Sequence, residues 1–335
     1  MHRTLSGSAL HLASLVCLLS VLPQCSQKVP EPEQPFQTSD RVYVANEASN
    51  TVTVVDVDTF TVIAEIDTLG HATHDLSLAR NGNQLWATNL ASGRISVINT
   101  NSMETIASIY TGKRAHVVTL TNDNKRAWVA NIGDNSVSIV DTKTFRVLGT
   151  IPTPTGPMGL TFTQDGRYAY VSTQDRTVSV VDTAAHQVIK KIPVKSNPHF
   201  LVVGPSGRIW GTNTGDKDIY IIDPTTNDIA HTIEVGPGPQ QIAFGFKGTA
   251  GPFAYVTVSG LNQVAIVETK ASEPKVLGYI DVGQGPNGIW GNSTGTRLYV
   301  GHTGSNNLMM IGTGTNQVMA TVPVGGKPIR VIASQ

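Results

Sequence analysis

The sequence predicts an all-β protein, a seven-bladed β-propeller of four-stranded antiparallel blades. One short strand pattern recurs seven times at steps of 43, 42, 42, 40, 45 and 44 residues, a spacing typical of propellers and solenoids. Three more strand-like segments follow each copy, separated by turn residues. The chain has 32 glycines and only 14% charged residues, which favours short strands joined by tight turns.

The repeat unit contains four strand-like segments. The first has the pattern of VYVAN, and its copies start at Val42, Leu85, Ala127, Ala169, Ile209, Ala254 and Leu298. The second ends in an acidic or amide residue, such as Asp141, which can start a turn by hydrogen-bonding the backbone. A third segment follows. After a Gly/Pro loop comes the fourth, which leads to the next copy through a hairpin such as QDGR.

The two ends of the repeat region indicate ring closure. The segment SDR before the first copy matches the end of the QDGR hairpin, and the final IRVIASQ matches the strand that precedes this hairpin. Residues 329–334 are therefore expected to pair with residues 42–46, so that the C-terminal strand completes the N-terminal blade. An open solenoid is the alternative, but it would need polar caps at both ends.

The N-terminal residues predict export. Leu10 to Leu22 form a mostly apolar run that is too short to span a bilayer and fits the core of a signal peptide, expected over residues 1–25. Cys25 lies at a position that resembles a bacterial lipoprotein processing site, where it would be lipidated. An ordinary cleaved signal is the alternative.

The remaining regions follow from composition. Residues 26–40 are rich in Pro, Glu and Gln and predict an extended tether, which leaves residues 41–335 for the propeller. The chain has two cysteines, both within residues 1–25, so the folded domain is expected to have no disulfide. We expect a periplasmic or cell-envelope protein, with an outer-membrane lipoprotein as one form.

Charge and hydropathy restrict the partners. The 24 Lys and Arg residues are balanced by 24 Asp and Glu residues, whereas nucleic-acid-binding proteins usually carry an excess of basic charge. No nucleic-acid partner is expected. Contact with a membrane is expected only through an N-terminal lipid anchor, since no later segment reaches membrane-spanning length. The protein is expected to be a monomer whose partner is a small molecule or an envelope protein.

The repeat segments resemble a known family. YVAN followed by NTVTVVD, WVANIGDNSVSIVD and YVSTQDRTVSVVD are similar to the YVTN family of β-propeller repeats, over residues 41–335. The resemblance implies the fold and does not select a function. Members and relatives include periplasmic and cell-surface binding proteins. The wider seven-bladed group includes lactonases, a streptogramin lyase, amine-dehydrogenase subunits and the haem-binding propeller of nitrite reductase.

Strand order predicts where a site would lie. We call the innermost strand of each blade A and the others B, C and D going outward. The D–A and B–C loops then share one face, and the residues after each D–A loop lead into the central channel. The candidate ligand-binding residues on this rim are His74, Asp75, His116, Met158, His199, Gln240, Gln241, Asn287, Arg330 and, on a B–C loop, His302. No catalytic residue is assigned.

The rim histidines have three interpretations. His74, His116 and His199 could be repeat residues that tie adjacent loops together, polar contacts for a ligand, or weak candidates for metal ligands. Zinc or copper would need neutral imidazole nitrogens that converge on one point. His74 and His116 come from neighbouring strands, whereas His199 would have to reach across the channel. The sequence requires no cofactor and leaves a metal or a haem-type tetrapyrrole as weak possibilities.

Asp75 and Arg330 occupy equivalent positions on adjacent blades. One interpretation is an ion pair across the seam where the ring closes. The other is a cluster of His74, Asp75 and Arg330 that recognises or activates an acidic or lactone substrate, because general acid–base catalysis needs such groups within hydrogen-bond reach of the substrate.

Aromatic residues recur once per copy in strand B, and this periodicity predicts packing between blades. They are Tyr43, Trp86, Trp128, Tyr170, Trp210, Tyr255 and Tyr299. Trp290 breaks the pattern because it lies in strand A, where we expect it to narrow the channel at the sixth blade.

Two main functions fit the sequence. The first is an exported binding protein that recognises a small ligand or a protein partner at the channel mouth, and the absence of a nucleophile motif favours it. The second is a periplasmic enzyme or cofactor-handling protein that uses the His/Asp/Arg rim. It would resemble a lactonase, a lyase or the tetrapyrrole-processing propeller of nitrite reductase. A purely structural envelope protein is a third reading. The sequence leaves the choice between enzyme and binder open and favours the binder.

Overall fold

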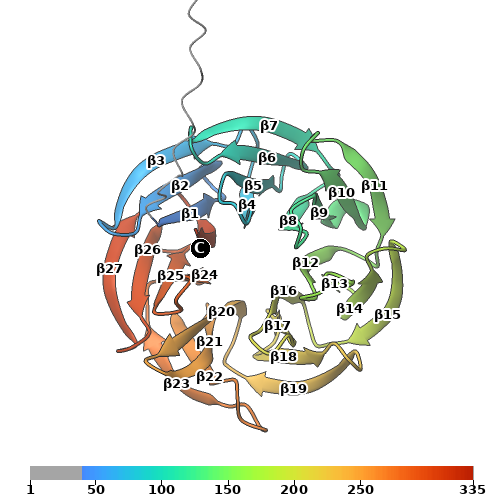
Figure 1. The fold of residues 1–335 in the computed structure, drawn as a ribbon. Helices are drawn as coiled ribbons and strands as arrows, with labels where there is room; N and C mark the ends of the chain where they lie inside the picture. Colours follow the sequence, from blue (N-terminus) through green and yellow to red (C-terminus); the bar gives the residue numbers. More distant parts are fainter. Residues whose placement is uncertain (1–39, 335) are drawn as a thin grey trace, which may run out of the picture. The chain divides into compact units, whose positions relative to one another are not determined.

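The computed structural model describes residues 40–334, which form a ring of seven four-stranded antiparallel sheets around a central channel (Figure 1). The predicted fold class is confirmed. The expected signal peptide, the lipidation of Cys25 and residues 26–39 of the expected tether lie outside the described residues. Within residues 40–334 there is no helix long and apolar enough to cross a membrane.

Every blade has one strand at each of the positions A to D. The A strands are β4 (Thr73–Leu78), β8 (Ala115–Leu120), β12 (Pro157–Phe162), β16 (Pro198–Val203), β20 (Pro239–Lys247), β24 (Pro286–Gly291) and β28 (Pro328–Ala333). The B strands are β1 (Arg41–Asn46), β5 (Gln84–Asn89), β9 (Arg126–Asn131), β13 (Tyr168–Thr173), β17 (Ile209–Asn213), β21 (Ala250–Val258) and β25 (Arg297–His302).

The outer half of each blade is equally regular. The C strands are β2 (Thr51–Asp56), β6 (Arg94–Asn99), β10 (Ser136–Asp141), β14 (Thr177–Asp182), β18 (Asp218–Asp223), β22 (Gln263–Glu268) and β26 (Asn307–Gly312). The D strands are β3 (Thr61–Asp67), β7 (Glu104–Tyr110), β11 (Val147–Pro152), β15 (Gln187–Pro193), β19 (Asp228–Glu234), β23 (Val276–Asp281) and β27 (Gln317–Pro323). A single 3-10 turn, η1 (Ile132–Asp134), follows β9.

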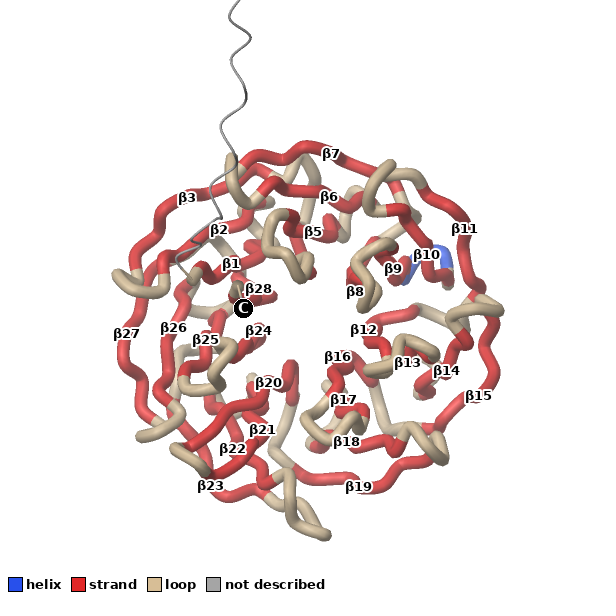
Figure 2. Tube along the Cα trace, viewed as in Figure 1, coloured by secondary structure: helices blue, strands red, loops and turns tan. Residues whose placement is uncertain are grey.

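Blade I joins the two ends of the propeller. Its strand order is β28-β1-β2-β3, and blades II to VII follow in chain order from β4–β7 to β24–β27. Strand β28 pairs antiparallel with β1, with Ala333 opposite Val42 and Pro328 opposite Asn46, and Figure 2 shows the two strands side by side. The predicted closure of the ring is confirmed. It pairs the edges of the first and last strands, which would otherwise expose unpaired backbone groups.

The core lies between the blades. One hydrophobic cluster joins Tyr43 and Val54 of blade I to Leu76 and Leu85 of blade II, and similar clusters follow around the ring. The strand-B aromatic residues are at most 2% exposed. Burying a large apolar side chain contributes about 1.5–3 kcal/mol. The strand-B aromatics therefore pack between blades, as predicted.

The turn chemistry also follows the sequence prediction. The Asp141 carboxylate accepts hydrogen bonds from the backbone N–H groups of Lys143 and Thr144, at 3.0 and 2.8 Å, and these bonds lower its pKa. In the QDGR hairpin, Gly166 has a φ of +70°, which a residue with a Cβ adopts at a steric cost.

A register shift recurs at the start of every strand A. In β4 it falls between Thr73 and Leu76, and equivalent shifts occur in the pairings of all the other A strands. A β-bulge of this kind re-aims side chains that regular pairing would point into the sheet. The fold therefore places one irregular segment per blade at the same end of the channel.

Candidate functional site: the channel mouth

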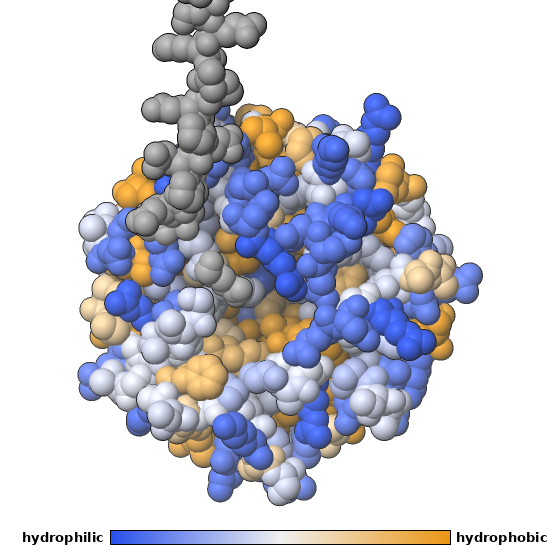
Figure 3. All heavy atoms as spheres, in the orientation of Figure 1, coloured by the Kyte–Doolittle hydropathy of each residue, from blue (hydrophilic) through white to orange (hydrophobic). Residues whose placement is uncertain are grey.

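The predicted rim residues lie in or next to these bulges. Those in A strands occupy the second or third residue of the strand: His74, Asp75, His116, Met158, His199, Gln240, Gln241, Asn287 and Arg330. The structure brings these side chains together at one mouth of the channel, as the contacts below show. Figure 3 shows one face of the propeller, hollowed at the centre of the ring.

Three imidazoles form a row at the mouth. The ring centroids of His74 and His116 lie 4.1 Å apart, and those of His116 and His199 lie 5.3 Å apart in an edge-to-face arrangement. His199 of blade V thus reaches His116 of blade III, which in turn packs against His74 of blade II. As predicted, His199 has to reach across the channel to make this contact.

The hydrogen bonds of these rings are incomplete. His116 Nδ1 lies 2.8 Å from the carbonyl oxygen of Met158, so this nitrogen carries the proton and donates it. Nδ1 of His74 and Nδ1 of His199 are buried with no hydrogen-bond partner among the described residues. A buried polar atom without a partner costs about 1–3 kcal/mol, and a ligand at the mouth could satisfy it.

Burial keeps all three imidazoles neutral. It lowers the pKa of His74 to about 3 and that of His199 to about 4, and it lowers the pKa of His116 well below the usual range. The nearby charge of Arg330 lowers the pKa of His74 and of His199 further. At neutral pH the rings are therefore uncharged donors and acceptors.

The metal hypothesis finds little support in this geometry. Among the described residues, no group of three or more His, Cys, Asp or Glu side chains is arranged to hold a metal ion. His116 Nδ1 is already committed to a backbone carbonyl. The His74 and His116 rings are tilted against each other, and the His116 and His199 rings pack edge to face, so the three rings contact one another and do not surround a point.

Arg330 lies at the centre of the mouth with its charge buried. Its Nη1 donates a 2.8 Å hydrogen bond to Gln241 Oε1 of blade VI. Its guanidinium carbon lies 5.0 Å from the centre of the Phe200 ring and 5.4 Å from that of Trp290. Cation–π contacts of this kind stabilise a desolvated guanidinium. No described residue accepts a hydrogen bond from Nη2.

Asp75 offsets the charge of Arg330. Its Oδ1 lies 3.0 Å from Arg330 Nε, in an ion pair without a well-directed hydrogen bond, and its Oδ2 accepts a 3.0 Å hydrogen bond from the backbone N–H of Val118. The predicted ion pair across the seam is confirmed. Burial raises the pKa of Asp75, and Arg330 opposes that rise.

Amide side chains complete the rim. Gln241 Nε2 donates to the carbonyl oxygen of Ile329 at 3.1 Å, and Asn287 Nδ2 donates to Gln240 Oε1 at 3.3 Å. Met158 is 9% exposed. The mouth thus combines neutral imidazoles, amides and one guanidinium, which together offer both donors and acceptors.

His302 does not lie on a B–C loop, where it was predicted. It is the last residue of β25, is fully buried and has no hydrogen-bond partner at either ring nitrogen among the described residues. Burial lowers its pKa to about 4. It takes the place of the buried Asn that ends strand B in other blades, such as Asn89 and Asn131, so it belongs to the core.

Two residues that contact Arg330, Trp290 and Phe200, were not predicted as site residues from the sequence. The Trp290 ring lies against the guanidinium of Arg330, and its strand pairs with β25, so it belongs to blade VII and not to the sixth blade. Phe200 occupies the same strand-A position as Asp75, Gln241 and Arg330, but it was not selected as a candidate ligand-binding residue. Only the convergence of β16, β24 and β28 shows that both rings cover one guanidinium.

The comparisons with known proteins support the fold. Residues 103–204 match the family described as YNCE-like beta-propeller, which is consistent with YVTN-type repeats. A search of the curated proteins found no match.

Solved structures share the architecture at low identity. Hydrazine synthase from Kuenenia stuttgartiensis has 20% identity and a TM-score of 0.72, covering 81% of this chain and 92% of that chain. The periplasmic gluconolactonase PpgL of Pseudomonas aeruginosa has 15% identity and a TM-score of 0.74, covering 88% and 99%. The dihydro-heme d1 dehydrogenase NirN, in complex with DHE, has 13% identity and a TM-score of 0.68, covering 90% and 77%. Likeness at this level shows the fold alone.

Proposed function

We propose that this seven-bladed propeller, which is consistent with the YVTN type, is an exported binding protein that holds a small acidic ligand at the channel mouth. The acidic group would accept hydrogen bonds from Arg330. The imidazoles of His74, His116 and His199 would contact the rest of the ligand. The observation that carries the proposal is a buried guanidinium beside neutral imidazoles that have unpaired nitrogens.

The contacts of Arg330 explain why an acid is favoured. Asp75, Gln241 and two aromatic rings hold the guanidinium in place, so little side-chain entropy is lost when a ligand binds. Both oxygens of Asp75 face donors within the protein, which limits its repulsion of an incoming carboxylate. Arginine is well suited to planar carboxylate recognition.

A second candidate is a catalytic or cofactor-handling role for the same mouth. Neutral imidazoles can accept a proton from a substrate, and the structural neighbours include a gluconolactonase and a dehydrogenase in complex with DHE. The lactonase version predicts that His116→Ala abolishes hydrolysis of glucono-δ-lactone. The tetrapyrrole version predicts a Soret band shift on titration with haemin. If lactone hydrolysis and a Soret shift are both undetectable, these two versions are excluded and only the binding proposal remains.

Titration with simple acids tests the binding proposal. We expect citrate, succinate or benzoate to perturb the ring resonances of the rim histidines in NMR spectra. His199→Gln and Gln240→Ala should each weaken binding by about threefold to tenfold, which corresponds to roughly 0.7–1.4 kcal/mol. These variants leave the Asp75–Arg330 pair in place, so the fold is preserved. If no acid perturbs the rim, or if both variants bind as well as the parent, the proposal is wrong.

A further inference from the structure

A second region departs from the repeat, at the end of the blades opposite the channel mouth. Between neighbouring blades, the strand-B aromatic of one blade packs against a residue of the next blade's C–D turn. Phe60 stacks on Tyr299 at 6.5 Å between centroids, and Phe145 meets Trp86 at 5.9 Å. Both phenylalanines have φ near +50 to +60°, so one turn geometry presents them.

At the junction of blades III and IV a histidine takes this position. His186 has a φ of +55°, and its ring lies 5.9 Å from that of Trp128; the equivalent turn residue is Phe60 in blade I and Phe145 in blade III, but Met103, Asn227 and Asn316 in blades II, V and VII. Gly149 occupies the strand-D position that holds Ala64, Ala107 and Ala320 in blades I, II and VII. A Cβ at Gly149 would meet no atom within 4 Å. Compared with the junctions built on Phe60 and Phe145, this junction has the smaller imidazole ring in the turn and no side chain at position 149 of strand D.

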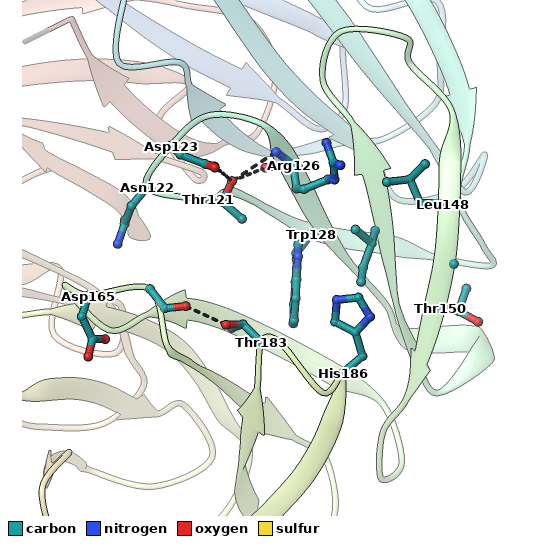
Figure 4. A pocket seen from close by; sticks show the side chains of 13 residues that line it. Thr121, Asn122, Asp123, Arg126, Trp128, Leu148, Thr150, Asp165, Thr183 and His186 are labelled. Carbon is teal, nitrogen blue, oxygen red and sulfur yellow. Dashed lines mark hydrogen bonds between the residues drawn. The ribbon is translucent and has the colours of Figure 1, made fainter.

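A cleft of about 560 Å³ lies between the two blades at this junction. Figure 4 shows Trp128 standing between Arg126 and His186, with Leu148 and Thr150 on one side and Asp165 and Asn122 on the other. The lining residues are Thr121, Asn122, Asp123, Arg126, Trp128, Ile139, Leu148, Gly149, Thr150, Asp165, Gly166, Thr183 and His186. The volume lies in the range of small-molecule sites.

The charges of the cleft disfavour an anion. The lining holds two carboxylates, Asp123 and Asp165, and one guanidinium, Arg126. The guanidinium is already paired with Asp141, whose Oδ2 lies 2.6 Å from its Nη1. A carboxylate or phosphate ligand would therefore meet the two carboxylates, of which Asp123 has the exposed ammonium of Lys125 at 3.6 Å.

The polar groups of the cleft suit a ligand with many hydroxyls. Arg126 and the indole N–H of Trp128 can donate, the carboxylates of Asp123 and Asp165 can accept, and threonine hydroxyls can do both. Unlike the indole nitrogens of Trp86, Trp210 and Trp290, that of Trp128 is not among the buried unpartnered atoms of the described residues. Leu148 is 54% exposed and offers an apolar surface beside these groups.

We propose that this cleft binds a neutral mono- or disaccharide. A sugar presents hydroxyls that both donate and accept, together with C–H faces that can pack on Leu148 and on the open backbone at Gly149. A neutral ring avoids the repulsion that an acid would meet. The proposal is independent of the channel-mouth function, because the two sites lie at opposite ends of the blades and share no residue.

An NMR titration of the full chain tests the proposal. The probes are glucose, galactose, N-acetylglucosamine and maltose, added up to about 20 mM, a range that detects binding near −3 to −4 kcal/mol. We expect one of these sugars to shift the indole N–H resonance of Trp128, assigned with Trp128→Phe, and to leave those of the other three tryptophans in place.

Two variants fill the cleft without disturbing the fold. His186→Phe restores the residue found at Phe60 and Phe145, and Gly149→Leu extends a side chain into open space. Each should weaken sugar binding at least about tenfold. The matched control is Gly278→Leu, at the equivalent position of β23, where a Cβ also meets no atom within 4 Å. It should bind like the parent.

Three outcomes would overturn the proposal. The first is no shift with any sugar at the highest concentration. The second is a shift that persists in both filled variants, which would place the sugar elsewhere. The third is a Trp128 shift produced by ethylammonium or acetate and by no sugar, which would show that the cleft selects charge.

Discussion

The channel mouth and the cleft between blades III and IV are built in opposite ways. At the mouth, side chains that differ from blade to blade are added at seven equivalent bulges, and they converge until Arg330 touches residues of four other blades. At the cleft, strand D has no side chain at Gly149, and the turn of the next blade presents only the imidazole of His186. The mouth is crowded and its groups are buried, whereas the cleft is open.

This difference teaches how a repeat can acquire a site. Packing between blades is repeated at every junction and leaves little room for chemistry, so a site needs a departure from the repeat. Side chains added near the channel axis depend strongly on one another, because every A strand approaches the same point. A smaller or absent side chain at a junction between blades creates space with few consequences for stability. The two regions should therefore respond very differently to mutation.

The largest contrast is expected from the ion pairs. Asp75→Ala should lower the free energy of unfolding by about 3–5 kcal/mol, because it leaves the buried guanidinium of Arg330 without a counter-charge. Arg126→Ala at the cleft should have a much smaller effect, since its ion pair is partly exposed and screened by solvent. Urea unfolding of both variants measures this. Equal losses would contradict the contrast between a crowded and an open region.

A pH profile should sharpen the same contrast. The rim histidines have folded-state pKa values well below 6.5, so the unfolded chain binds protons that the folded chain does not. Their contribution to stability is complete above pH 6.5 and is lost as the pH falls toward about 4. Each should cost about 1.4 kcal/mol between pH 7.5 and 5.5.

Urea unfolding across this pH range measures the effect. His199→Gln should flatten the profile, because it removes one of the groups that take up a proton on unfolding. Met158→Leu changes the same rim without removing a titratable group and should leave the slope unchanged. A slope identical in all three proteins would rule out the buried neutral state of His199.

The last contrast comes from two glycines, and the smaller of the two expected effects is at the cleft. A Cβ at Gly159 would lie 2.0 Å from the carbonyl oxygen of His199, so Gly159→Ala should cost about 1–3 kcal/mol through overpacking. At Gly149 the Cβ has free space, and Gly149→Ala should stabilise by about 0.4–1 kcal/mol by restricting the unfolded chain. Thermal unfolding should show shifts of opposite sign. If both variants unfold at a lower temperature than the parent, the cleft at Gly149 is packed and not open.

The repeat was predictable because it is a local pattern. The spacing of VYVAN-like segments, the turn residue Asp141 and the hairpin glycine Gly166 each act through neighbours in the chain, and the matching ends predicted the pairing of residues 329–334 with residues 42–46. The rim residues at the starts of strands A followed from strand order alone. The sequence by itself therefore determined the ring, its closure and the end of the channel at which unlike side chains gather.

The tertiary structure alone decided which of these residues interact. Arg330 touches Phe200 and Gln241 across the channel, and no spacing along the chain encodes that distance. His302 was misplaced because the end of a strand and the start of a loop look alike in sequence, and burial separates them. The cleft beside Trp128 escaped prediction because it lies between Gly149 of one blade and His186 of the next. The space between two such residues becomes visible only when neighbouring blades are packed together.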